Sequence, residues 1–191
     1  MFIFDVETLG VESTAVVLSA ALIYFDPEQR PSYKDLLESA LFVKFNARDQ
    51  IQRLNRTIDP STLEWWENQH EYVQQVSLRP SSTDMKAEDG ITAMHNYMNR
   101  IPNAQKHTMW ARGSLDQLAI DSLAVRCEMQ QITSYAAWRD IRTAVDILTG
   151  ATNGYCDVDY PGFERHEVIK HHPVHDCALD AMMLMYGKTN Q

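Results

Sequence analysis

Residues Phe2–Glu7 read Phe-Ile-Phe-Asp-Val-Glu, a short apolar segment that predicts a strand and carries two acids. Successive side chains of a strand point to opposite faces, so Asp5 and Glu7 share one face while Phe4 and Val6 share the other. Two carboxylates on one face of a buried strand repel each other and resist desolvation. A divalent cation between them would remove both penalties. The alternative is an edge strand with a solvated acidic face.

The other segments predict an α/β fold. Apolar or alternating runs predict further strands at residues 16–25, 41–45, 107–111 and 133–138. Helical spacing and helix-start signals predict a helix from residue 59 and helices at 83–101, 115–129, 140–148 and 173–186. Three consecutive strands indicate an antiparallel meander, and the later strand–helix alternation indicates parallel additions. This is the ribonuclease H-like order: a mixed five-stranded sheet with helices on both faces, in a single domain over residues 1–191.

Composition limits the class of protein. Hydrophobic residues make up 45% of the chain and charged residues 23%, as in ordinary globular proteins. No apolar run reaches the roughly 20 residues that a membrane helix needs, and no signal peptide is expected. The 3 cysteines form no CxxC pair, so neither a disulfide framework nor a zinc knuckle is indicated. We therefore expect a protein of the reducing cytoplasm that has no membrane segment.

The net charge of −9 comes from 26 acidic and 17 basic residues. Broad electrostatic binding of nucleic acid usually needs a basic face, so the charge argues against it. An enzyme that grips only a strand end stays compatible with this charge, because bound divalent cations would offer positive charge to phosphates.

Two further acids, Asp116 and Asp121, lie on the helix predicted after the fourth strand. Asp116 falls in the first turn at the mouth of the sheet, where it could complete the acidic site or simply offset the helix dipole. Asp121 lies more than a turn deeper, where a solvated helix face is expected. We expect Asp116 as the third acid of the site, with Asp121 as the alternative.

The helix predicted at 173–186 offers a fourth acid and a histidine. Asp180 lies beyond the first turn, where the helix dipole does not explain it. His175 comes five residues earlier, near the helix start, where the chain could carry it over the site. His171 and Asp176 have the same spacing, but Asp176 is explained as a first-turn acid. We therefore favour His175 with Asp180.

Five stretches resemble one group of nucleases. Residues 4–10 (FDVETLG) resemble the first motif of DnaQ-like (DEDD) 3′→5′ exonucleases, and residues 175–181 (HDCALDA) resemble the third motif of their DEDDh branch. Residues 59–69, 110–113 and 138–143 are similar to the phage exonuclease A (DexA-type) subgroup. The resemblance covers essentially the whole chain. Its second motif departs from the pattern, because Leu115 stands where the family usually has an aromatic residue before its aspartate.

The resemblance implies a metal-dependent 3′→5′ exonuclease, and its phage-type motifs favour an exodeoxyribonuclease. Two Mg²⁺ or Mn²⁺ ions would be held by Asp5, Glu7, Asp116 and Asp180. His175 would be the general base that takes a proton from the attacking water. The products would be 5′-mononucleotides, released from a single-stranded or frayed 3′ end of DNA. If the chain is phage-encoded, its location would be the host cytoplasm.

Substrate contacts are expected from Thr8, Leu9, Gly10, Trp65, Trp66, Gln69 and Arg112. In the family, the residue after the first motif wedges against the terminal base, which implies this role for Leu9. Trp65 and Trp66 lie about 100° apart on a helix, so at most one is exposed and the other is core. The exposed one could stack on a base. Arg112 could contact a phosphate or pair with an acid.

Two alternatives to the exodeoxyribonuclease stay open. The first is a 3′→5′ exoribonuclease, since no residue that would recognise a 2′-hydroxyl can be identified. The second is a catalytically inactive nucleic-acid-binding module, which would be expected to lose one of the acids or the histidine. All five of these residues are present. Neither oligomeric state nor processivity follows from the sequence.

Overall fold

Five strands form one mixed sheet within residues 1–189, which are the residues that this computed structural model describes. They are β1 (Phe2–Thr8), β2 (Val17–Tyr24), β3 (Leu41–Lys44), β4 (Met109–Ala111) and β5 (Trp138–Asp140). Their order is β3-β2-β1-β4-β5. β2 pairs antiparallel with β1 and β3, whereas β4 pairs parallel with β1 and β5. The predicted meander with parallel additions is confirmed.

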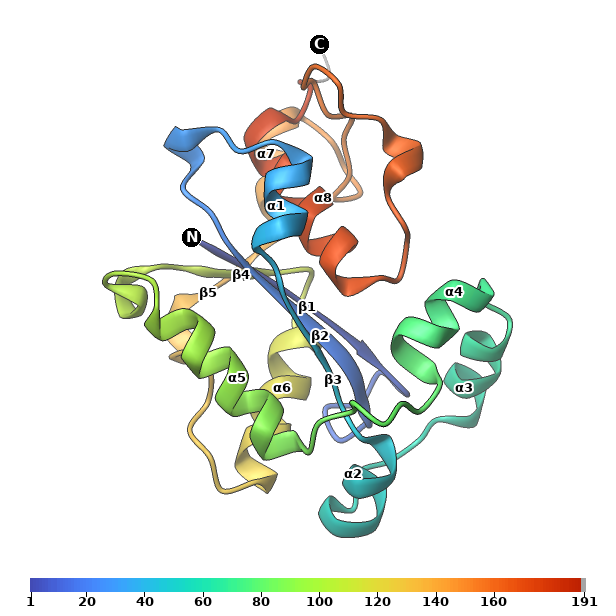
Figure 1. The fold of residues 1–191 in the computed structure, drawn as a ribbon. Helices are drawn as coiled ribbons and strands as arrows, with labels where there is room; N and C mark the ends of the chain where they lie inside the picture. The colour runs from blue at the N-terminus through green and yellow to red at the C-terminus, as the bar shows by residue number, and fades with distance from the viewer. Residues whose placement is uncertain (190–191) are drawn as a thin grey trace.

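The helices cover both faces of this sheet, as expected (Figure 1). Helices α5 (Ala87–Asn99) and α6 (Leu115–Arg126) pack on one face. Helices α1 (Tyr33–Ser39), α7 (Ile141–Thr149) and α8 (Pro173–Tyr186) pack on the other. Helices α2 (Ala47–Leu54), α3 (Pro60–Glu67) and α4 (Glu71–Val73) lie toward the end of the sheet where β1 finishes (Figure 1).

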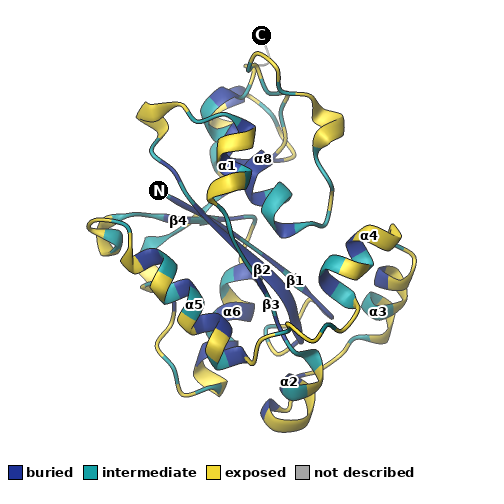
Figure 2. Cartoon of the chain, in the orientation of Figure 1, coloured by how far each residue is buried: buried dark blue, intermediate teal, exposed yellow. Residues whose placement is uncertain are grey.

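Alternation along β1 divides the core into two clusters. Phe2, Phe4 and Val6 are buried against α5 and α6. Ile3 is buried on the opposite face, in the cluster that contains the apolar side of α8. Asp5 and Glu7 share the parity of Ile3 and therefore lie on the α8 side. Figure 2 shows β1 and β2 as the buried centre and the outer faces of the helices as exposed.

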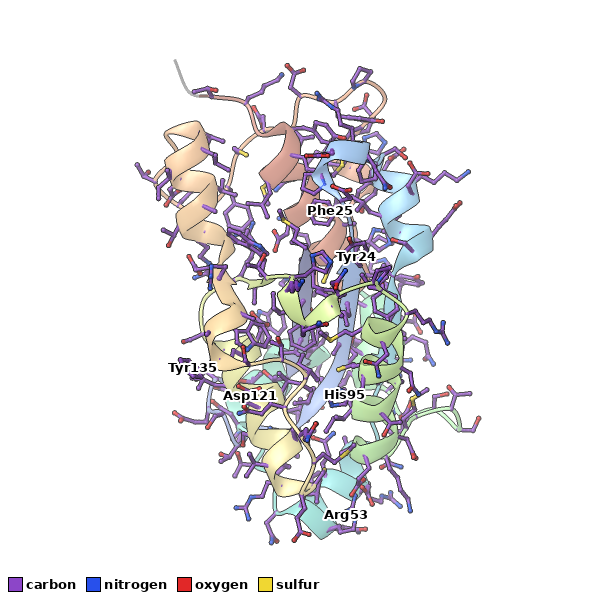
Figure 3. All side chains as sticks on the ribbon, turned by 90° about the vertical axis from the view of Figure 1, so that its left-hand side faces the viewer. Tyr24, Phe25, Arg53, His95, Asp121 and Tyr135 are labelled. Carbon is purple, nitrogen blue, oxygen red and sulfur yellow. The ribbon has the colours of Figure 1, made fainter. Side chains whose placement is uncertain are left out.

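The main differences from the predicted elements are one shortened strand and two helices that were not predicted. The predicted strand at 133–138 begins only at Trp138, because residues 135–137 form a 3₁₀ turn and the Tyr135 side chain is 83% exposed (Figure 3). Helix α1 was not predicted, although Ser32 and Asp35 form a capping box at its start. Helix α2, capped by Asn46, was not predicted either. No helix among residues 1–189 combines the length and apolar character needed to cross a membrane.

Candidate active site

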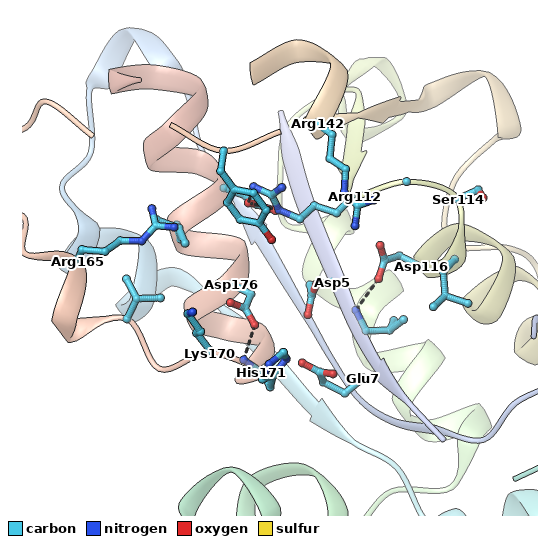
Figure 4. A pocket seen from close by; sticks show the side chains of 17 residues that line it. Asp5, Glu7, Arg112, Ser114, Asp116, Arg142, Arg165, Lys170, His171 and Asp176 are labelled. Atoms are coloured by element: carbon cyan, nitrogen blue, oxygen red, sulfur yellow. Dashed lines mark hydrogen bonds and ion pairs between the residues drawn. The ribbon is translucent and has the colours of Figure 1, made fainter. Parts of the chain in front are cut away.

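One cavity of about 1010 Å³ opens where the end of β1 meets the starts of α6 and α8. Its walls bring together acids that are far apart in the sequence (Figure 4). Five carboxylates line it: Asp5, Glu7, Asp116, Asp176 and Asp180. The prediction that Asp5 and Glu7 leave the same face of the first strand is confirmed.

Asp5 lies at the centre of the cluster and lacks a protein partner on one oxygen. Its Oδ2 is buried and makes no hydrogen bond to any residue of the described range. Burial, followed by the charges of Asp116 and Glu7, raises the pKa of Asp5 well above its usual value. Burial and the charge of Asp176 do the same for Glu7. An orphaned carboxylate oxygen among other carboxylates has the donor chemistry that Mg²⁺ and Mn²⁺ prefer.

Asp116 reaches the cluster because two strands separate. β1 and β4 pair only at Phe2 and Ile3, so the backbone N–H of Val6 is left free. Asp116, in the first turn of α6, accepts that N–H at 3.1 Å through Oδ1. Burial raises the pKa of Asp116 to about 7 even though this hydrogen bond opposes the shift.

Asp121 does not reach this cavity. It borders a separate surface hollow with Ser13, Leu118 and Ser122, on the side of the molecule shown in Figure 3. Gln117 donates to its Oδ2 at 3.4 Å. Of the two candidate acids on α6, only Asp116 is therefore near Asp5 and Glu7.

Helix α8 presents Asp176, rather than Asp180 alone, to the acids of β1. Ligand atoms of Glu7, His171 and Asp176 lie within 4.8 Å of one another. His171 has a left-handed backbone with a φ of 62°, and its N–H donates to Asp176 Oδ2 at 2.9 Å. Its ring centroid lies 4.8 Å from that of Trp65, edge to face. The sequence analysis favoured His175 with Asp180 over His171 with Asp176. In the structure, it is His171 and Asp176 that lie beside Glu7 of β1.

His175 lies outside this cavity. Its Nδ1 lies 2.8 Å from the Tyr33 hydroxyl and also accepts the backbone N–H of Ile169 at 3.4 Å. Its ring packs against those of His172 and Tyr33. The expectation that the chain carries His175 over the acids is not met, because α8 turns this side chain toward α1.

Asp180 lines the cavity but already has a cationic partner. Arg112, which directly follows β4, approaches Asp180 Oδ1 at 2.7 Å through Nε and at 2.6 Å through its second terminal nitrogen. The guanidinium also donates to the carbonyl of Gly154 at 2.9 Å and lies over the ring of Tyr155. Of the two roles considered for Arg112, the structure shows pairing with an acid. This ion pair ties β4 to α8 and to the 150–170 segment.

Replacing Asp180 by asparagine should lower the free energy of unfolding by about 3–5 kcal/mol. The two side chains are only 11% and 3% exposed, so the change leaves a buried guanidinium without its carboxylate. Urea unfolding measures the loss. The double change Arg112→Met with Asp180→Leu should recover most of it, because neither charge is then buried alone. An unchanged stability of Asp180→Asn would show that the pair contributes nothing.

The turn after β1 is packed rather than open. Leu9 is 4% exposed and buried against Val16, Leu18 and Trp66, so the predicted wedge on a terminal base is contradicted. Leu9 follows the end of β1, beyond the register shift between Glu7 and Thr8, and its side chain packs into this cluster. The neighbouring Thr8 is also buried, and its hydroxyl donates to the backbone carbonyl two residues on.

Gly10 lets this turn pack closely. A Cβ built at Gly10 would lie 3.1 Å from the Cβ of Ala15 and 3.4 Å from that of Asp59. Because Gly10 has no side chain, the turn can pack closely against the start of α3. Gly10 is not among the residues that line the cavity.

The tryptophan pair on α3 behaves as the helical geometry predicts. Trp66 is buried and donates its indole N–H to the Thr8 carbonyl at 2.9 Å, whereas Trp65 is 42% exposed. The prediction that at most one is exposed is confirmed. Gln69 donates to the Trp65 carbonyl at 3.0 Å and does not line the cavity.

Several cavity residues were not predicted from the sequence. They are Arg142, Tyr155, Arg165, Lys170, His171 and Asp176. The sequence analysis considered His171 and Asp176 as a pair but favoured His175 with Asp180. Arg142 makes no ion pair with Asp140 or any other acid among residues 1–189. Asp140 instead caps α7 and accepts the N–H of Gly113.

The metal-free protein should lose stability as the pH rises from about 4 to about 7. Burial raises the pKa of both Asp116 and Asp176 to about 7, from 3.8. Within this window the native state binds more protons than the unfolded state, so the free energy of unfolding falls with pH. Burial lowers the pKa of three histidines, His171, His172 and His175, which act in the opposite sense within this window. Burial raises the pKa of all five cavity acids, so the loss of stability with rising pH prevails.

Thermal unfolding in the presence of a chelator, across this pH range, tests the dependence. Mn²⁺ should flatten it, because bound cations replace the missing counter-charge. Asp176→Asn should weaken the dependence without metal. A melting temperature that rises with pH over the same range would contradict the electrostatic description of the cavity.

Comparison with known proteins places the chain in a family of nucleases. A family model described as the 3′-5′ exoribonuclease Rv2179c-like domain matches residues 1–186. The chain is also 28% identical over 204 residues to a protein of Enterobacteria phage T4 named exodeoxyribonuclease, an alignment that covers 97% of this chain and 88% of the phage protein. The expectation of a 3′-5′ exonuclease family is thereby confirmed. The chain belongs to the 3′-5′ exoribonuclease Rv2179c-like domain family.

Proposed function

We propose that this protein is a metal-dependent 3′→5′ exonuclease that releases 5′-mononucleotides from the 3′ ends of DNA. The observation that carries the proposal is the convergence of Asp5, Glu7, Asp116 and Asp176 on one cavity beside His171. Family membership supports exonuclease activity. The similarity to a phage protein named exodeoxyribonuclease supports DNA as the substrate.

These four acids would hold two Mg²⁺ or Mn²⁺ ions. Carboxylate oxygens are the preferred ligands of both metals, and the unpartnered Asp5 Oδ2 fits this role. When bound, the ions would lower the pKa of a water molecule and offset charge on the phosphate. We assign the fourth ligand to Asp176 rather than Asp180, because Arg112 already neutralises Asp180.

His171 would act as the general base. Burial and the nearby charge of Lys170 lower the pKa of His171, which favours a neutral imidazole at pH 7. A neutral ring nitrogen can accept the proton of the attacking water. The edge-to-face contact with Trp65 and the N–H bond to Asp176 hold the ring beside the acids. Trp65 is thereby a positioning residue for His171.

An exoribonuclease is the second candidate, because the description of the family names this activity. Digestion of 5′-labelled single-stranded DNA, duplex DNA and RNA, each with Mg²⁺, Mn²⁺ or chelator, separates the candidates. We expect a ladder that shortens from the 3′ end of DNA and disappears with chelator. A ladder on RNA alone would establish the second candidate. No cleavage of any substrate with either metal would overturn the proposed function and favour a nucleic-acid-binding module.

A further inference from the structure

Three cations stand on the walls of the acidic cavity, each from a different segment. Arg142 is the second residue of α7, Arg165 begins a 3₁₀ turn, and Lys170 lies in the loop before α8. All three side chains are exposed and line the cavity (Figure 4). Three positive charges at one opening are conspicuous in a chain whose net charge is −9.

None of these three side chains forms an ion pair within residues 1–189. Across residues 1–189, none makes a salt bridge within 4.0 Å of a carboxylate. Arg112 differs, because it binds Asp180 directly and has further partners on its other nitrogens. The cavity therefore has one cation that pairs with an acid and three that have no ion-pair partner among residues 1–189.

The simplest alternative is that these cations only compensate the charge of the acids. Arg142 does favour the ionised forms of Asp116 and Asp180, and Arg165 those of Asp176 and Asp180. Compensation is strongest in contact, however, because Coulomb attraction falls with distance. Cations that face the acids across a cavity leave room for an anion between them.

We infer that Arg142, Arg165 and Lys170 bind phosphate groups of a single-stranded polynucleotide, upstream of the bond that is cut. This inference rests on the proposed function and specifies which side chains bind the phosphates of its substrate. Arginine and lysine are the usual phosphate-binding side chains, and exposed ones bind without loss of internal contacts. The remaining acidic surface would repel a long duplex, so binding is confined to the strand end that enters the cavity.

The test combines the changes Arg142→Gln, Arg165→Gln and Lys170→Gln in one variant. Affinity for a fluorescein-labelled oligothymidylate is measured by fluorescence anisotropy, with Ca²⁺ in place of Mg²⁺, over a range of salt concentrations. Each lost phosphate contact reduces the salt slope for single strands by about 0.7, so three reduce it by about 2. At about 0.1 M salt the same loss corresponds to roughly 100-fold weaker binding.

Two controls separate these contacts from a general effect of charge. Glutamine at Arg100, Lys106 and Arg126 removes the same number of charges from exposed positions that do not line the cavity. This variant should keep the salt slope of the wild type. Exchanging arginine for lysine, and lysine for arginine, at the three cavity positions should restore most of the binding. An unchanged slope for the cavity variant, or an equal loss in the control, would overturn the inference.

Cleavage assays distinguish failure of this inference from failure of the proposed function. The p-nitrophenyl ester of thymidine 5′-monophosphate has one phosphodiester and no upstream phosphate. Lys170 lowers the pKa of His171, and Arg142 and Arg165 favour the ionised acids, so this assay is run at about pH 8 with saturating Mn²⁺, where His171 is neutral and the acids are ionised in both proteins. Under these conditions the cavity variant should cleave the ester as the wild type does while losing activity on the oligonucleotide. An equal loss on both substrates would place the cations at the reacting phosphate and overturn the inference. If the wild type cleaves neither substrate, the proposed function fails, and the anisotropy results still decide the inference.

Discussion

Replacing His171 by alanine should lower kcat by about 10²- to 10⁴-fold, whereas replacing His175 should leave kcat within about threefold. His171 lies beside Glu7 and Asp176, and its ring lines the cavity. His175 is held by Tyr33 on the far side of α8. Only the first ring can accept a proton from a water bound among the acids. Single-turnover digestion of a 5′-labelled oligonucleotide measures the two rates.

The His175→Ala variant needs a stability control. Loss of its hydrogen bond with Tyr33 should cost about 1 kcal/mol, so its rate is measured well below its melting temperature. Tyr33→Phe removes the same hydrogen bond and should also keep its activity. The assignment would be wrong if His175→Ala is folded but shows the large loss in kcat while His171→Ala stays active. The general base would then be His175.

The dependence of the cleavage rate on pH distinguishes a general base from a histidine with a purely structural role. Below the pKa of His171 the imidazole is protonated and cannot accept the proton, so the wild-type rate should fall toward acidic pH. This acidic limb should lie below the usual histidine pKa of 6.5, because burial lowers that of His171. With saturating Mn²⁺, which keeps Asp116 and Asp176 ionised, this limb should be absent from the residual activity of His171→Ala.

Local sequence did not reveal which histidine and which acid near the start of α8 face the cavity. Helix α8 was predicted with its observed bounds, Pro173–Tyr186. Which of its acids faces β1 depends on how the helix docks, and a first-turn acid is equally well explained by the helix dipole. The left-handed backbone of His171 is also not encoded by residue type, since non-glycine residues adopt it only in a particular context.

The elements that were predicted well are those whose pattern is local. Alternation in β1 assigned Asp5 and Glu7 to one face, and the apolar run at residues 16–25 predicted the strand that the structure shows as β2. No helix or strand was predicted between the helices at 140–148 and 173–186, so the cavity residues Tyr155 and Arg165 had no predicted position. Leu9 was misplaced because a resemblance between motifs carries no information on the packing of the following turn.

Replacing Asp5 by asparagine should have two opposite effects on the protein. It should lower kcat by about 10³-fold or more, which corresponds to about 4 kcal/mol of lost transition-state stabilisation. It should also raise the melting temperature of the metal-free protein. Asp5 is surrounded by other acids, and its Oδ2 has no hydrogen-bond partner, so removing its charge relieves burial and repulsion together.

The combination of these two effects separates a metal ligand from a structural acid. A carboxylate that serves the fold, such as Asp180 beside Arg112, lowers stability when it is neutralised. Asp121→Asn is the matched control, because Asp121 is a partly buried acid outside the cavity and should keep full activity. Mn²⁺ should raise the melting temperature of the wild type and of Asp121→Asn, but much less that of Asp5→Asn. If Asp5→Asn proves less stable than the wild type without metal, or cleaves DNA normally, then Asp5 does not hold the metal ions. The acidic cavity would then need an explanation other than catalysis.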